Sequence, residues 1–129
     1  MSDYSGQTVH IAVPRILPTW NELLSGKYMN PHAYRRLRDG WQSDMYHLIG
    51  HRDRAWLEAM AALKKKMRVE VHSERRRRVD PDNLSVKVLL DALKRNKFIH
   101  DDGEKYCEHV VTQSKGPTIE TRITISEAK

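Results

Sequence analysis

The chain has 129 residues, of which 39% are hydrophobic and 31% are charged, a composition typical of a soluble globular protein and not of a disordered one. This length predicts a single domain over residues 1–129, and no apolar run approaches the roughly 20 residues that a membrane span needs. The N-terminus lacks the basic-then-apolar pattern of a secretory signal, and a single cysteine, Cys107, excludes an internal disulfide and a cysteine-rich zinc site. We therefore expect a cytoplasmic protein that does not contact a membrane.

The net charge of +6 is concentrated in one short segment. Residues 64–78 hold eight Lys or Arg and two Glu, whereas the remainder of the chain is close to neutral. Such a patch is typical of a protein that binds a phosphate backbone, and equally of a solvated basic face that aids solubility. Three of its lysines, Lys64 to Lys66, also fall in the last turn of an expected helix, where they would complement the helix dipole.

Three segments alternate apolar and polar side chains, which is the pattern of a strand with one buried face: residues 9–13, 67–72 and 119–125. Residues 106–113 are also expected to form a strand. A turn from Ser114 to Pro117 separates this strand from residues 119–125, and we expect the two to form a hairpin. The predicted fold class is therefore α+β, with a small mixed sheet of about four strands packed with helices in a single domain.

Two helices are expected between the first two strands. Asn30 followed by Pro31 is typical of a helix start, and apolar residues then recur at spacings of three and four up to Gly50, which ends or kinks the helix. A second helical pattern begins near Trp56. Residues 16–29 have no clear period, so we expect a loop there.

A third helix is expected to begin at Asp80. Asp80 suits the N-cap, Pro81 suits the first helical position, and Asp82 would lie in the first turn, where a negative charge favours the dipole. The four preceding arginines, Arg75 to Arg78, cannot all pack inside because each guanidinium stays charged, so they must face water, carboxylates or phosphate. Cations beside clustered carboxylates suggest a polyanionic substrate next to a divalent metal.

The expected third helix is apolar on two sides. One stripe contains Leu89 and Leu93, and another contains Val88 and Ala92, so the helix is expected to be buried on both, against other helices or in a dimer interface. Asp91 would lie about 16 Å along the helix axis from the N-cap at ~1.5 Å per residue, which is too far to share a metal ion with it.

A second acidic pair, Asp101 and Asp102, follows this helix. Asp-Asp-Gly is an ordinary turn sequence, but a helix and a short return can also bring such carboxylates back beside a neighbouring loop. Two carboxylate pairs about twenty residues apart, next to an arginine run, are more than turns require.

The ordered motifs Asp80-Pro81-Asp82-Asn83-Leu84, Leu90-Asp91-Ala92-Leu93 and Asp101-Asp102 resemble the RusA family of Holliday junction resolvases, which are crossover-junction endodeoxyribonucleases that are often prophage-borne. The early strand, with Pro18 and Asn21 in the loop that follows it, and the closing strands also fit the family. Residues 51–66 look longer than in compact members and have no assigned family role.

The resemblance implies that Asp80, Asp82 and Asp102 are metal-binding catalytic carboxylates, with Asp101 as an accessory group. Family members also use a lysine shortly after D-x-D-N, and the corresponding Lys87 lies one residue later than usual. Lys87 would stabilise the leaving oxygen or pair with Asp91, four residues along the helix. The resemblance further implies Mg²⁺, with Mn²⁺ as a substitute, and a homodimer that nicks both strands of a four-way DNA junction. Arginines would hold the DNA backbone without reading its sequence: Arg75, Arg76, Arg77 and Arg78.

Two alternatives need no catalysis. In a basic nucleic-acid-binding protein the aspartates would be caps and turns, and binding would depend strongly on salt. In a phage interaction protein the charges would only keep the chain soluble. A zinc site at His47 and His51 would need a third ligand that is not evident in the sequence.

Overall fold

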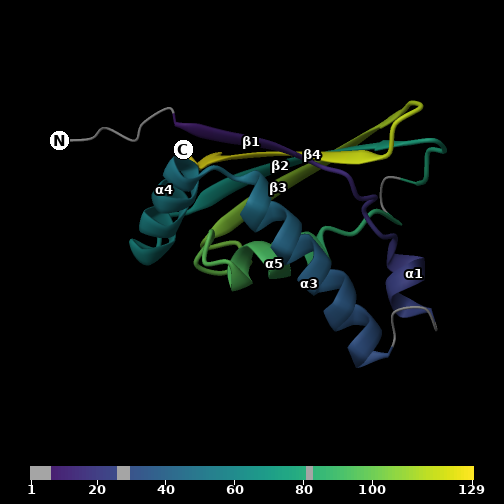
Figure 1. Cartoon of the computed structure of the whole chain (residues 1–129), viewed down its shortest axis with the longest axis horizontal. Coiled ribbons are helices and arrows are strands. Elements are labelled where there is room, and N and C mark those ends of the chain that lie inside the picture. Colours follow the sequence, from purple (N-terminus) through teal and green to yellow (C-terminus); the bar gives the residue numbers. More distant parts are fainter. Residues whose placement is uncertain (1–6, 26–29, 81–82) are drawn as a thin grey trace.

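A computed structural model of the chain describes residues 7–25, 30–80 and 83–129. Within these residues a four-stranded sheet carries helices on one of its two sides (Figure 1). The expected α+β class with a small mixed sheet is confirmed. In chain order the elements are β1 (Thr8–Val13), α1 (Trp20–Leu24), α3 (Pro31–Leu48), α4 (His51–Ala62), β2 (Met67–Arg75), α5 (Lys87–Arg95), β3 (Cys107–Lys115) and β4 (Glu120–Glu127).

The strands lie in the order β1-β4-β2-β3. Strand β4 is antiparallel to both β1 and β2, whereas β3 is parallel to β2. The expected hairpin between the last two strands is therefore wrong, because β2 lies between them. A parallel neighbour requires a crossover connection, and α5 supplies it between β2 and β3.

Alternation along each strand separates a helix-covered face of the sheet from an open face. In β2 the buried residues Met67, Val69 and Val71 point toward the helices, while Glu70 and His72 point away from them. The largest buried side chains come from helices, strands and the segments that connect them, and they form one core: Trp41, Phe98, Leu17, Met45, Ile49, Leu57, Met67, Leu89, Leu93, Ile99, Ile123 and Ile125.

The predicted start of α3 at Asn30-Pro31 and its end before Gly50 are confirmed, whereas α4 begins at His51, before the expected start near Trp56. The side chain of Asn30 caps α3 by accepting a 2.8 Å hydrogen bond from the His32 amide, and Pro31 occupies the first turn. Helix α3 ends at Leu48, and Gly50 is the N-cap of α4. None of the helices among the described residues is long and apolar enough to cross a bilayer.

Helix α1 lies in the segment that was expected to be a loop. Thr19 and Glu22 form a reciprocal capping box, in which the Thr19 hydroxyl accepts from the Glu22 amide at 3.1 Å and a Glu22 carboxylate oxygen accepts from the Thr19 amide at 3.2 Å. The Thr-x-x-Glu pattern was the sequence signal for this helix. Five residues are too few to show a hydrophobic period.

Helix α5 begins at Lys87 and not at Asp80. Leu84 forms an isolated bridge with Thr19, and the Ser85 amide donates to the carbonyl oxygen of Pro18 at 3.1 Å. These long-range bonds hold the chain extended where local capping preferences favoured a helix. The axial separation of Asp80 and Asp91 expected for one continuous helix therefore does not apply, while Pro81 and Asp82 lie outside the described residues.

Both apolar stripes of α5 are buried within the chain itself. Val88, Leu89, Ala92 and Leu93 are each fully shielded from solvent and belong to the single core. Since α3 packs against α5, the second stripe needs no dimer partner to cover it.

Candidate functional site

The arginine run is divided between the interior and the surface. Arg76, Arg77 and Arg78 are exposed, whereas Arg75, the last residue of β2, keeps only 8% of its surface. One guanidinium nitrogen of Arg75 donates to the carbonyl oxygen of Leu17 at 2.8 Å, and burial lowers the pKa of the guanidinium. The expectation that Arg75 faces DNA with its neighbours is therefore wrong, because strand alternation turns its side chain toward the helix side of the sheet.

The turn that contains the first predicted carboxylates is tied to the loop after β1. The Asn83 amide donates to the Asp80 carbonyl oxygen at 2.8 Å, and the Asn83 side-chain oxygen accepts from the Asn21 amide at 3.3 Å. Arg75 holds the same loop through Leu17. Asp80 is exposed on this turn. The described residues Asp80 and Asn83 are therefore held against the loop after β1, and Asp82 lies outside the described residues.

Lys87 and Asp91, which lie one turn apart on α5, both contact Tyr34 of α3. The Tyr34 hydroxyl donates a short hydrogen bond to an Asp91 carboxylate oxygen, and the Lys87 ammonium lies 4.7 Å from the centroid of the Tyr34 ring. In the described part of the chain no ion pair joins Lys87 to Asp91. Sequence spacing suggested that pair, but it could not show that a tyrosine of α3 contacts both side chains.

The second acidic pair lies on a return loop that begins at the end of α5. Lys97 adopts a left-handed conformation with φ of 62°, and the Phe98 amide donates back to the Leu93 carbonyl oxygen at 2.9 Å. The Lys94 ammonium then lies 3.2 Å from an Asp101 carboxylate oxygen. Hydrogen bonds from Asp102 and Lys94 lower the pKa of Asp101. Asp101 therefore stabilises the loop through its contacts with Lys94 and the Asp102 amide.

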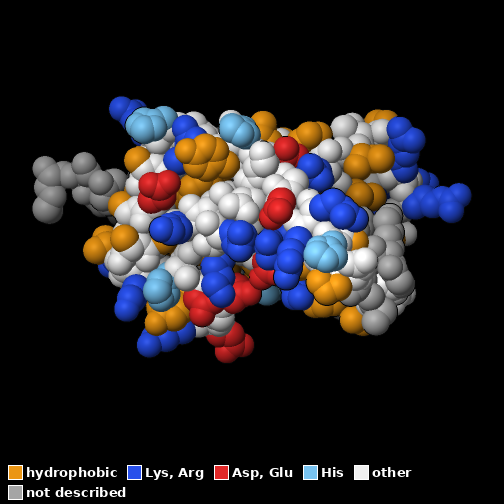
Figure 2. Space-filling model, turned by 60° about the horizontal axis from the view of Figure 1, so that its bottom comes forward, with side chains coloured by type: hydrophobic (Ala, Val, Ile, Leu, Met, Phe, Trp, Pro, Cys, Tyr) orange, Lys and Arg blue, Asp and Glu red, His pale blue; other side chains and the backbone are white. Residues whose placement is uncertain are grey.

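Asp102 is exposed, and its charge affects the pKa of one group on each of α3, α5 and β3. Burial and the hydrogen bond to Asp91 raise the pKa of Tyr34, and the Asp102 charge adds to that shift. The same charge contributes to raising the pKa of Lys94, after the larger effect of Asp101. Acidic side chains gather beside Lys and Arg side chains on the helix side of the molecule (Figure 2). Asp102 is therefore near enough to Tyr34, Lys94 and Cys107 for its charge to act on the pKa of each.

The available donors suit a hard cation. Burial raises the pKa of the nearby Cys107 thiol to about 11, and the charges of Asp102 and Glu108 add to the effect, so this thiol stays protonated at neutral pH. The predicted ligands on the two segments are carboxylates, whose oxygens Mg²⁺ prefers, and the exposed His100 beside Asp101 adds one imidazole. Among the described residues, which exclude Asp82, no three His, Cys, Asp or Glu side chains form a group that could hold a metal ion.

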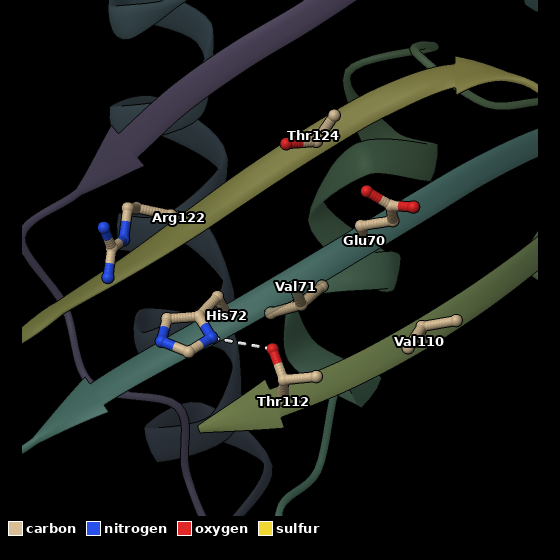
Figure 3. A pocket seen from close by; sticks show the side chains of 7 residues that line it. All are labelled: Glu70, Val71, His72, Val110, Thr112, Arg122 and Thr124. Atoms are coloured by element: carbon tan, nitrogen blue, oxygen red, sulfur yellow. Dashed lines mark hydrogen bonds between the residues drawn. The ribbon is translucent and has the colours of Figure 1, made fainter. Parts of the chain in front are cut away.

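A separate hollow of about 540 Å³ lies on the open face of the sheet (Figure 3). His72 is held there from both ring nitrogens, at 2.7 Å from the Thr112 hydroxyl oxygen and at 2.9 Å from that of Ser114. Arg122 at its rim lies 3.5 Å from a Glu74 carboxylate oxygen. The described residues assigned to the site from the sequence do not line this hollow.

Comparison with known proteins adds no assignment. No protein-family model matches the chain, and no curated protein matches it. The likeness to the RusA family rests on the ordered motif residues themselves.

Proposed function

We propose that the chain is a Mg²⁺-dependent, structure-selective endodeoxyribonuclease that resolves four-way DNA junctions by paired nicks, in recombination and repair. The observation that supports this most is the ion pair of 3.2 Å between Lys94 and Asp101, which holds the Asp101-Asp102 loop beside the end of α5. The second acidic pair of the ordered motif set thus lies next to the helix that carries Lys87.

In this proposal Asp80, Asp82 and Asp102 hold the cation. A bound Mg²⁺ supplies an activated water and neutralises charge on the phosphate. Lys87 is exposed at the start of α5, so its ammonium can approach a phosphate oxygen and stabilise the leaving oxygen. The exposed arginines Arg76 to Arg78, which precede α5 in the chain, hold the DNA backbone.

Paired nicks require two such sites, which a two-fold homodimer provides. The second apolar stripe of α5 is already covered by the chain's own core, so the dimer must use another surface. In this reading the junction spans two protomers, each of which cleaves one strand.

The test is cleavage of a synthetic four-way junction by the unmodified chain and by Asp82→Asn. We expect the variant to lose at least about 10²-fold in cleavage rate and to bind the junction with little change, because the carboxylate serves the metal and not the DNA backbone. Asp39→Asn, an exposed aspartate of α3 paired with Arg38, is the matched control and should cleave normally. Cleavage should stop with a chelator and return with Mg²⁺ or Mn²⁺.

Cleavage retained by Asp82→Asn, or activity that depends on zinc, would rule out this assignment. The exposed arginines also support a second candidate, a non-catalytic basic nucleic-acid-binding protein. That candidate predicts strongly salt-dependent junction binding and no nick with either metal.

A further inference from the structure

Lys87 and Asp91 carry opposite charges on one face of α5, at the spacing at which helical side chains form ion pairs. Each contacts Tyr34 and not the other. The Asp91 carboxylate accepts from the Tyr34 hydroxyl, and the Lys87 ammonium lies over the Tyr34 ring at 4.7 Å from its centroid. One side chain from a different helix therefore takes the contacts that the two α5 residues would otherwise make with each other.

The two ends of a tyrosine suit these two partners. A phenol hydroxyl is a donor that satisfies a carboxylate oxygen, and the face of an aromatic ring attracts a cation without neutralising it. The ammonium over the ring keeps its N–H donors for another acceptor. Lys87 is exposed, so that acceptor can be a group brought by a ligand.

We infer that Tyr34 is a positioning residue that keeps Lys87 available to a DNA phosphate, because it occupies the carboxylate of Asp91 and supports the ammonium on its ring. The inference rests on the proposed function and assigns a role within the same site. Tyr34 touches no reacting atom and acts through Lys87. Arg38 and Asp102 are the other charged groups whose fields reach Tyr34.

The kinetic test uses Tyr34→Phe, which keeps the ring and removes the hydroxyl. Asp91 then loses its donor and draws Lys87 into an ion pair, so the cleavage rate of a four-way junction should fall roughly tenfold. This loss is smaller than the loss of about 10²-fold or more that follows complete removal of a charged stabilising group, because Lys87 is still present. Tyr34→Phe combined with Asp91→Asn should recover to within about threefold of the unmodified chain, because the amide no longer attracts Lys87. Asp91→Asn alone completes the double-mutant cycle.

Tyr46→Phe is the matched control, because it is the same substitution on the same helix and removes a hydroxyl on an exposed side chain that faces Arg54 and Phe98. It should leave cleavage unchanged. A structural role of the Tyr34 hydroxyl predicts that the double variant is no better than Tyr34→Phe. That outcome, or a Tyr34→Phe variant that cleaves at the normal rate, would overturn the inference.

A second measurement does not depend on nuclease activity. In a chain with ¹³C-labelled lysine, the Tyr34 ring current should shift the Cε protons of Lys87 upfield, and Lys87→Arg identifies the signal. The shift should shrink in Tyr34→Phe and return in the double variant. A chain that shows these shifts but cuts no junction would contradict the proposed function and retain the role of Tyr34, whereas an unshifted Lys87 signal would overturn that role.

Discussion

The segments on either side of α5 are supported in different ways. The described residues of the first segment, 76–80 and 83–86, are held by hydrogen bonds to Pro18 and Asn21 in the loop after β1 and by the buried side chains of Leu84 and Val86. The second segment, residues 96–106, is held by the buried side chains of Phe98 and Ile99, by backbone bonds within the loop, and by long-range bonds to Gln42 and Met67. The two segments therefore rest on different neighbours, so substitutions should affect them separately.

The largest effect is expected at Phe98, which anchors the second segment. Phe98→Ala opens a cavity in the core and should lower the free energy of unfolding by about 3–5 kcal/mol, measured by urea denaturation. The side chain is fully buried, so little relaxation can offset the loss. Lys97→Ala, at the exposed neighbouring position, is the control and should change the midpoint far less. Equal effects at the two positions would mean that the core does not anchor this loop.

A smaller effect, local to the first segment, is expected at Arg75. Arg75→Met removes the hydrogen bond to Leu17 and should cost roughly 1–3 kcal/mol, the usual penalty for a buried acceptor left without its donor. Hydrogen exchange of the Ser85 amide, which is bonded to Pro18, should accelerate more than exchange in β2. Arg76→Met, at the exposed neighbouring position, should leave both quantities unchanged. The idea that Arg75 supports this segment fails if the Ser85 amide exchanges at its normal rate.

The smallest effect on stability is expected at Arg77. Its effect on DNA binding distinguishes the exposed arginines from the buried Arg75. Arg77→Ala should leave the midpoint of denaturation unchanged and reduce the slope of log affinity for junction DNA against log salt by about 1, as the loss of one phosphate contact does. Arg75→Met should not change that slope, because its guanidinium is buried. A change in slope for Arg75→Met and none for Arg77→Ala would reverse the assignment of the two positions.

Local patterns were sufficient to predict most of the fold. Alternation identified β1, β2 and β4, and the Asn30-Pro31 start and Gly50 located the limits of α3. Pairing could not be predicted in the same way, because alternation defines the face of a strand and not its neighbour. The expected hairpin was wrong for that reason, and α5 starts late because Leu84 pairs with Thr19, a residue far away in the sequence.

The sequence named the charged residues of the candidate site but could not predict their environment. The motifs identified Asp80, Lys87 and Asp102, whose roles remain predictions. Spacing alone could not show that Tyr34 contacts both Lys87 and Asp91, because those contacts depend on how α3 packs against α5. Nor could a run of four identical residues reveal that only Arg75 is buried, since this follows from the point at which β2 ends.

The position of β4 has a consequence for the order of folding. Strand β1 pairs only with β4 among the described strands, although more than a hundred residues separate their partners, such as Val9 and Ile125. The unit made of β2, α5 and β3 closes a much shorter loop, so it can form first, and β4 then adds beside β2, alone or already paired with β1. Such a high contact order favours slow folding, with an unpaired β2 edge exposed until β4 arrives.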